Sequence, residues 1–120
     1  MNTQVTIDVN GDPRQILECA YDTLLSMKQP STLLNVPDVS NYIDPHLLFA
    51  RVCVEKRFNE KRAIVCLVVV RQINDTKCEL SFTADTTLSS SPGKGNVVVL
   101  MSEFLQLFSQ NYYSPAQPQP

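Results

Sequence analysis

The sequence predicts an α+β domain in the order β-α-β(4)-α, with an antiparallel sheet and two helices packed on one face. Two helical apolar stripes and three closely spaced strands lead to this prediction. The central strand contains residues 63–70, eight consecutive apolar residues flanked by Arg62 and Arg71. Eight residues are too few to span a bilayer and suit a buried strand, and the β-branched side chains favour a strand over a helix.

A short strand and a helix open the chain. Alternating valine and isoleucine residues predict a strand over residues 3–9, and Asn10-Gly11 predicts a turn. Asp12 is expected to cap the next helix, with Pro13 in its first position. The apolar stripe of this helix consists of Ile16, Leu17, Ala20, Tyr21, Leu24 and Leu25.

Three strands are expected in the middle of the chain, after an extended connection over residues 30–45 that contains three prolines. The strands cover residues 47–58, 62–73 and 77–84. Two-residue connections, Asn59-Glu60 and Asn74-Asp75, predict tight hairpins between them.

The rest of the chain is expected to form a polar loop, a strand and a helix. The strand covers residues 97–100, and Ser102 caps a helix with an apolar stripe. That stripe consists of Met101, Phe104, Leu105, Phe108 and Tyr112. Residues 1–113 are thus predicted to form a single domain, and residues 114–120, with three prolines, to begin a disordered tail or linker.

Hairpin register predicts which face of the three strands is buried. If each hairpin turns on its two named residues, one face is apolar throughout. It consists of Ala50, Val52, Val54, Ala63, Val65, Leu67, Val69, Cys78, Leu80, Phe82 and Ala84. This face is expected to carry the two helices.

The opposite face is predicted to hold an apolar stripe between polar neighbours, which is typical of a partner-binding surface. The stripe consists of Phe49, Cys53, Ile64, Cys66, Val68 and Val70. Two alternatives stay open. Residues 30–45 would cover the stripe from within the chain, or the central strand is β-branched for propensity alone.

A basic hairpin tip offers a second candidate site. It consists of Lys56, Arg57, Lys61 and Arg62. Such a tip suits the phosphate of a lipid head group or of a nucleic acid. A solvated tip is the favoured interpretation, because the net charge is −2 and the pI is about 5.2.

The sequence contains no strong motif for catalysis, for a cofactor or for a metal. Cys53 and Cys66 are expected to be cross-strand neighbours, but no histidine or third cysteine accompanies them, so they make a poor zinc site. His46 is the only histidine and lacks the nucleophile context of a catalytic triad. We therefore expect no enzyme.

The four cysteines lie within apolar patterns, which predicts a reduced, intracellular protein. The beginning of the chain has neither a basic segment nor an apolar core typical of a signal peptide. A cytoplasmic location is expected, with the nucleus as the alternative.

The predicted order of elements resembles the plan of TATA-binding-protein-like folds and of kinase-associated C-terminal domains. The resemblance covers residues 3–113. It rests on Asp12-Pro13 opening a helix after a short strand and on Leu47-Leu48-Phe49 opening the next strand. It implies a non-catalytic module that binds partner proteins or acidic phospholipids.

From the residues and this resemblance, the main hypothesis is a protein–protein interaction module, a scaffold or an oligomerisation domain, which acts through one sheet face. Phosphate contact through the basic tip is the alternative. A carrier of a small apolar ligand, enclosed between sheet and helices, is the second alternative, and the short chain makes it the weakest because its apolar surface is needed for the core.

Overall fold

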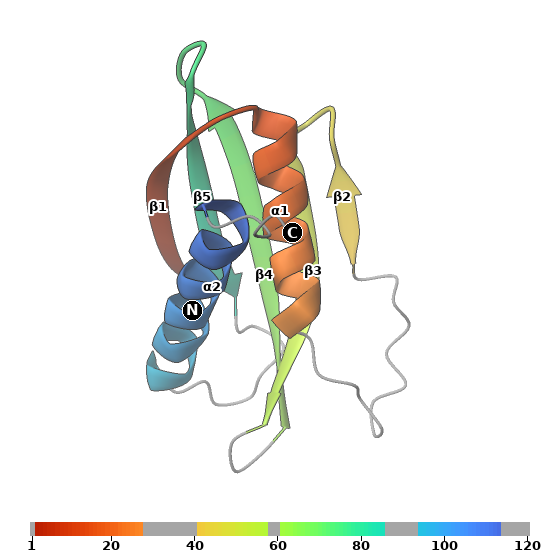
Figure 1. Ribbon diagram of the computed structural model, residues 1–120. Coiled ribbons are helices and arrows are strands. Elements are labelled where there is room, and N and C mark those ends of the chain that lie inside the picture. Colours follow the sequence, from red (N-terminus) through yellow and green to blue (C-terminus); the bar gives the residue numbers. More distant parts are fainter. Residues whose placement is uncertain (1, 28–40, 58–60, 86–93, 114–120) are drawn as a thin grey trace, which may run out of the picture.

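The computed structural model describes residues 2–27, 41–57, 61–85 and 94–113, which form one antiparallel sheet and two helices (Figure 1). The elements are β1 (Asn2–Asn10), α1 (Pro13–Met27), β2 (Tyr42–Asp44), β3 (Phe49–Arg57), β4 (Lys61–Gln72), β5 (Lys77–Asp85) and α2 (Lys94–Tyr113). The strand order is β1-β5-β4-β3-β2, so β4 is central. The predicted fold class is confirmed.

Helix α1 forms where the sequence predicts it. The Asp12 carboxylate accepts hydrogen bonds from the backbone N–H groups of Arg14 and Gln15, both at 3.1 Å. These bonds satisfy two of the donors that a helix N-terminus leaves open, as expected of an N-cap. The buried face of α1 consists of Ile16, Leu17, Ala20, Thr23, Leu24 and Met27.

The predicted register is wrong by one residue in both hairpins. Val68 pairs with Ala50 on β3 and with Phe82 on β5. Each connection is three residues long rather than two: residues 58–60 separate β3 from β4, and in the second hairpin the Ile73 N–H donates to the Lys77 carbonyl across residues 74–76.

One extra residue in each loop turns β4 over while leaving β3 and β5 as predicted, because side chains alternate between the two faces of a strand. Cys66, Val68 and Val70 therefore point under the helices, with exposures of 0%, 0% and 3%. Leu67 is half-buried and Val69 is exposed on the opposite face, which we call the open face.

Two elements differ from prediction along the chain. Residues 97–100 are helical rather than extended and belong to the beginning of α2. Leu100 and Met101 lie on the same side of α2 as Phe104, where all three are buried, and this packing overrides the strand propensity of the valine run. The short edge strand β2, within the predicted connection, takes the place of the strand expected at 97–100.

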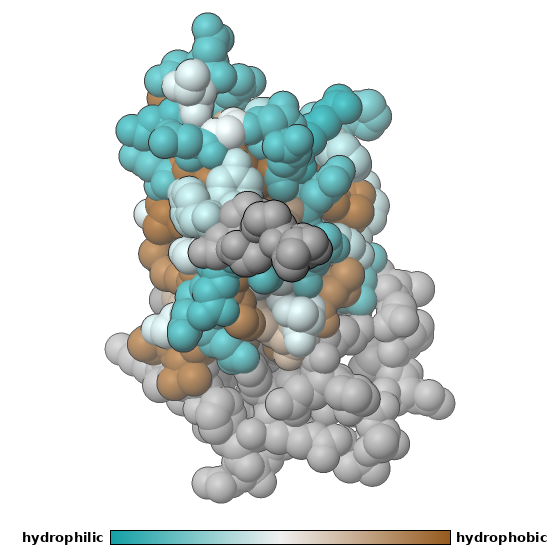
Figure 2. Space-filling model, viewed as in Figure 1, coloured by the Kyte–Doolittle hydropathy of each residue, from teal (hydrophilic) through white to brown (hydrophobic). Residues whose placement is uncertain are grey.

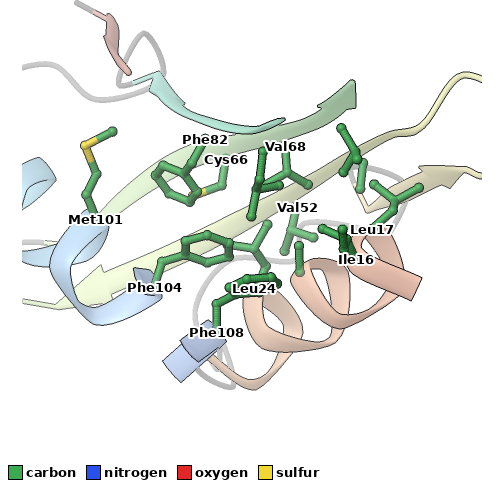
Figure 3. Close-up of a cluster of buried hydrophobic side chains, with 14 of the residues drawn as sticks. Ile16, Leu17, Leu24, Val52, Cys66, Val68, Phe82, Met101, Phe104 and Phe108 are labelled. Carbon is green, nitrogen blue, oxygen red and sulfur yellow. The ribbon is translucent and has the colours of Figure 1, made fainter. Parts of the chain in front are cut away.

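The core lies between the covered face of the sheet and the two helices (Figure 3). α1 packs directly on β3 and β4, whereas α2 packs on β5 and beside α1. Within the described residues, the most exposed members of the core are Met101 at 7% and Met27 at 4%. Neither described helix contains an apolar stretch long enough to cross a membrane.

Candidate functional site

The two helices form a V over the covered face of the sheet. They run in opposite directions, lie close together where α2 ends, and diverge towards the beginning of α2 (Figure 1). Both helices pack on this sheet face, and α2 meets the sheet at β5. This region is our candidate site.

An aromatic column fills the region between α2 and β5. We define it as Phe82 on β5 with Phe104, Phe108 and Tyr112 on α2. Successive ring centroids lie 4.5, 5.9 and 5.4 Å apart, and successive ring planes are within 30° of parallel. The column is continuous because the three α2 rings are spaced four residues apart and therefore lie on one helix face. Figure 3 shows the first two of them, Phe104 and Phe108, with Phe82.

A hydrogen bond closes one end of the column. The Tyr112 hydroxyl donates to the Asn10 carbonyl at 2.7 Å, where β1 turns into α1. Gly11 follows with a φ of 138°, and a Cβ atom there would collide with the Tyr112 hydroxyl. Glycine is therefore required at this position both by the backbone and by the close approach of the ring. We call this contact the Tyr112 latch.

A second polar contact joins the helices near the latch. Thr23 is fully buried in α1, and its hydroxyl donates to the Cys19 carbonyl at 2.7 Å. The Asn111 side-chain amide of α2 donates to the same hydroxyl at 3.2 Å. The buried hydroxyl thus has partners on both helices, and it ties the last turn of α2 to α1.

Two thiols and the Tyr112 phenol near the latch are held in their neutral forms. Burial raises the pKa of Cys78, whose thiol lies 3.5 Å from the Gly11 carbonyl, and the charge of Asp12 adds to the shift. Burial also raises the pKa of Cys19 and of Tyr112. A thiol with a raised pKa is a poor nucleophile at neutral pH, so this end of the site offers packing and hydrogen bonding rather than nucleophilic attack.

Residues 98–101, near the beginning of α2, are apolar on the outer side of the helix as well as on its inner side. Val98 and Val99 are 56% and 53% exposed, while Leu100 and Met101 beside them are buried. Figure 2 shows apolar surface at the lower left, over this end of α2. The site therefore has a hydrogen-bonded end at the latch and an apolar end beside residues 98–101 of α2.

The predicted partner-binding stripe is not a single surface. Cys66, Val68 and Val70 lie in the core because β4 is turned over. Phe49 remains on the open face, half-buried, with its ring 5.9 Å from that of Tyr42. The side chains of Cys53 and Ile64 lie outside the described residues.

The other sequence-based site predictions fare differently. The prediction that Cys53 and Cys66 are cross-strand neighbours is wrong, since Cys66 pairs with Val52 and Cys53 pairs with Val65. The backbone of Lys56, Arg57, Lys61 and Arg62 lies at the end of the β3–β4 hairpin, but their side chains lie outside the described residues.

His46 is an exposed turn residue whose N–H donates to the Asp44 carboxylate at 2.9 Å. Backbone hydrogen bonds at this turn, first from Leu47, hold the pKa of Asp44 below its ordinary value. Among the described residues, no three side chains of the metal-binding types gather into one group.

Sequence reasoning missed the aromatic column as a site. The sequence predicts the apolar stripe of α2 but indicates only an ordinary core. That Phe104 stacks on Phe82 does not follow from the sequence, because it depends on where α2 begins and on how the strands lie beneath it. The usable signal is the spacing of Phe104, Phe108 and Tyr112, which places three rings on one helix face.

Solved structures share the fold of this chain. The chain is similar to the di-domain aromatase/cyclase BexL of the BE-7585A biosynthetic pathway, with a TM-score of 0.67 and 9% identity over 98% of this chain and 48% of that one. The di-domain aromatase/cyclase StfQ of the steffimycin pathway matches with a TM-score of 0.60 and 11% identity, over 91% of this chain and 44% of that one. This chain thus spans about half the length of each di-domain protein.

A match over nearly the full length of both chains comes from the Zhui aromatase/cyclase of Streptomyces sp. R1128. Its TM-score is 0.51 and its identity is 10%, over 98% of this chain and 99% of that one. The chain has a helix-grip fold. No protein-family model and no curated protein sequence matches it.

These comparisons correct three expectations. The resemblance to kinase-associated and TATA-binding-protein-like domains is wrong, because the structural neighbours are aromatase/cyclases and related helix-grip proteins. The main hypothesis of an interaction scaffold is contradicted for the same reason. The expectation that the chain is no enzyme is also contradicted, since the fold includes aromatase/cyclases.

Proposed function

We propose that this chain binds a small apolar molecule between α2 and the covered face of the sheet. The observation that carries the proposal is the aromatic column in a helix-grip fold. Phe104 lies 4.5 Å from Phe82, centroid to centroid, so the helix meets β5 through flat ring faces. The flat face of an aromatic ring is a surface on which an apolar or aromatic ligand can stack.

Two further features support this proposal. The core members nearest to solvent are methionines, whose unbranched side chains adapt to ligands of different shape. The matched structures are, by their names, aromatase/cyclases, two of them from biosynthetic pathways. The site in this chain is apolar except at the latch end, which favours an apolar ligand.

The proposal is tested by equilibrium binding of a neutral apolar fluorophore, N-phenyl-1-naphthylamine, to the full chain. The chain contains no tryptophan, so the probe is excited without interference from indole. We expect saturable binding at one site. Phe82→Leu should weaken it by up to about tenfold in Kd, because a stacked ring contributes about 0.5–1.5 kcal/mol beyond its buried area.

Leu17→Ala is the matched control. Leu17 is as fully buried as Phe82 but lies on α1, on the other side of the core from Met101 (Figure 3). It should lower stability without changing the affinity for the probe. Non-saturable binding by the wild type, or equal loss of affinity in both variants, would contradict a ligand site beneath α2.

A further inference from the structure

We infer that the outer edge of β1 pairs with the same edge of a second copy of this chain, so that two sheets join across a two-fold axis. The contact lies at the edge of the sheet rather than on either of its faces. It does not depend on the proposed ligand, because it uses backbone groups and side chains outside the region between α2 and β5.

The two edges of the described sheet differ in length and in protection. At one edge, β2 is three residues long and ends at Asp44, whose carboxylate accepts N–H groups of the following turn. At the other edge, β1 is nine residues long and pairs with β5 in an unbroken register. It contains no proline, lysine or arginine, although proline and charged residues, lysine above all, commonly protect edge strands. A long, regular edge of this kind is a template for pairing with another strand.

Alternate residues of β1 direct their backbone groups away from β5. The Gly11 N–H donates to the Thr76 carbonyl at 3.0 Å, which places the odd-numbered residues of β1 in hydrogen-bonded pairs with β5. The N–H and C=O groups of the even-numbered residues therefore point outwards, and the Asn10 carbonyl, which accepts the Tyr112 hydroxyl, is one of them. The outward-facing residues between the two ends of the strand are Gln4, Thr6 and Asp8.

The strand is complementary to a second copy of itself when the two-fold axis passes beside Thr6. Thr6 is the middle residue of β1, so this antiparallel register pairs the strand along its whole length. Thr6 then pairs with the second copy's Thr6, and Gln4 pairs with the second copy's Asp8. Each of these pairs can exchange two backbone hydrogen bonds through groups that face away from β5. An axis beside Asp8 would instead place two carboxylates opposite each other, which is unfavourable.

The side chains of β1 also fit this register on both faces of the sheet. On the open face, the exposed Gln4 amide would donate to the second copy's Asp8 carboxylate, which lies 3.2 Å from Lys77 of its own chain. On the covered face, Val5 would face the second copy's Ile7. Both residues are only partly buried in one copy, and Figure 2 shows apolar surface along the side of the molecule where β1 lies. Pairing would bury these side chains further.

The test is sedimentation velocity of the full chain at concentrations from about 1 to 500 µM, since a single pair of strands is a small interface. We expect a reversible monomer–dimer equilibrium. Thr6→Pro removes an outward-facing N–H group and leaves the hydrogen bonds to β5, so it suits an edge strand but not a strand paired on both sides. It should raise the dimer Kd at least about tenfold, because symmetry removes two hydrogen bonds. Thr6→Ala is the matched control: it keeps the N–H group and should change the Kd less than about threefold.

A second pair of variants tests the register at the exposed Gln4 position. Gln4→Lys would place an ammonium group opposite the second copy's Asp8 at two symmetric places, and it should lower the dimer Kd about fivefold at low salt. Gln4→Glu would place a carboxylate there and should raise the Kd by a similar factor. Lysine ordinarily discourages edge pairing, so a tighter dimer with Gln4→Lys is expected only from this register.

Far-UV circular dichroism checks the fold of each variant, and if Thr6→Pro does not fold, the two Gln4 variants decide. A wild type that stays monomeric over the whole range would overturn the inference. So would a dimer that is indifferent to Thr6→Pro, or one that Gln4→Lys and Gln4→Glu weaken equally. Association that survives Thr6→Pro and is lost in Val69→Asp would assign the contact to the open face, where Val69 is 43% exposed.

Discussion

The two helices cover the same sheet face by different means. α1 meets β3 and β4 through aliphatic side chains and through Ala20, which is fully buried and lets the helix approach closely. α2 meets β5 through Phe104 and its neighbouring rings. Interdigitated aliphatic side chains leave little room for a foreign molecule, whereas stacked ring faces present a surface that another flat or apolar group can share. The α1 side is thus packed by aliphatic side chains, and the α2 side is the one to which we assign the proposed ligand.

The largest expected effects come from truncating each side in turn. Phe104→Ala should lower the free energy of unfolding by about 3–5 kcal/mol and Leu17→Ala by about 2–5 kcal/mol, because both create cavities in the core. Urea denaturation of the two variants measures these losses. Repeating the urea denaturation of both variants in saturating benzene, which fills apolar cavities, tests whether the two cavities differ.

Benzene should restore part of the stability of Phe104→Ala and little of that of Leu17→Ala. The reason is that Phe104 lies between the rings of Phe82 and Phe108, on which benzene can stack, whereas Leu17 belongs to the aliphatic side of the core. Equal recovery in both variants would break the contrast between the helices.

A smaller effect is expected at the turn where α2 is latched to the other half of the fold. Gly11→Ala introduces a side chain at a φ of 138° and against the Tyr112 hydroxyl, so we expect a loss of about 1–3 kcal/mol in the free energy of unfolding. Asp12→Ala, the neighbouring change, removes only the helix cap and should cost about 1 kcal/mol. If the two variants are equally stable and release the probe at the same rate, the latch has no special role.

The difference between the helices also explains what the sequence could predict. α1 is amphipathic and has a cap, and its beginning and buried face follow from local chemistry, with Asp12 bonded as expected. The beginning of α2 does not follow locally, because Val97–Val99 prefers a strand and is helical only through the packing of the residues after it. Local propensity is decisive where packing agrees with it and fails where packing opposes it.

The register of the central strand depended on loop length alone. β4 is apolar on both faces, so its own pattern cannot choose between Leu67 and Val68 as the core residue. β3 and β5 alternate clearly, and their inward residues, such as Val52 and Phe82, were predicted correctly. The site beneath α2 required both the helix start and this register, which is why its residues were recognised as apolar but not as a site.

The smallest expected effect separates the latch hydrogen bond from the ring stacking around it. Tyr112→Phe keeps the ring and removes the hydroxyl that donates to Asn10. Near neutral pH the variant should be less stable by about 1 kcal/mol, the usual net contribution of one hydrogen bond.

The stability difference between wild type and Tyr112→Phe should also depend on pH. Burial raises the pKa of Tyr112 above its ordinary value of 10.0, with smaller contributions from Tyr113, the two nearby thiols and Asp12. Because the folded state holds the phenol proton more tightly, the stabilisation is fully present below pH 10 and is lost as the pH rises through the folded pKa. The thiols of Cys19 and Cys78 titrate in both proteins, so their effect on the difference largely cancels. Urea midpoints at pH 7, 9 and 10.5 should show the gap closing at the highest pH, and a gap that widens with pH would mean that the latch is not held by a protonated Tyr112.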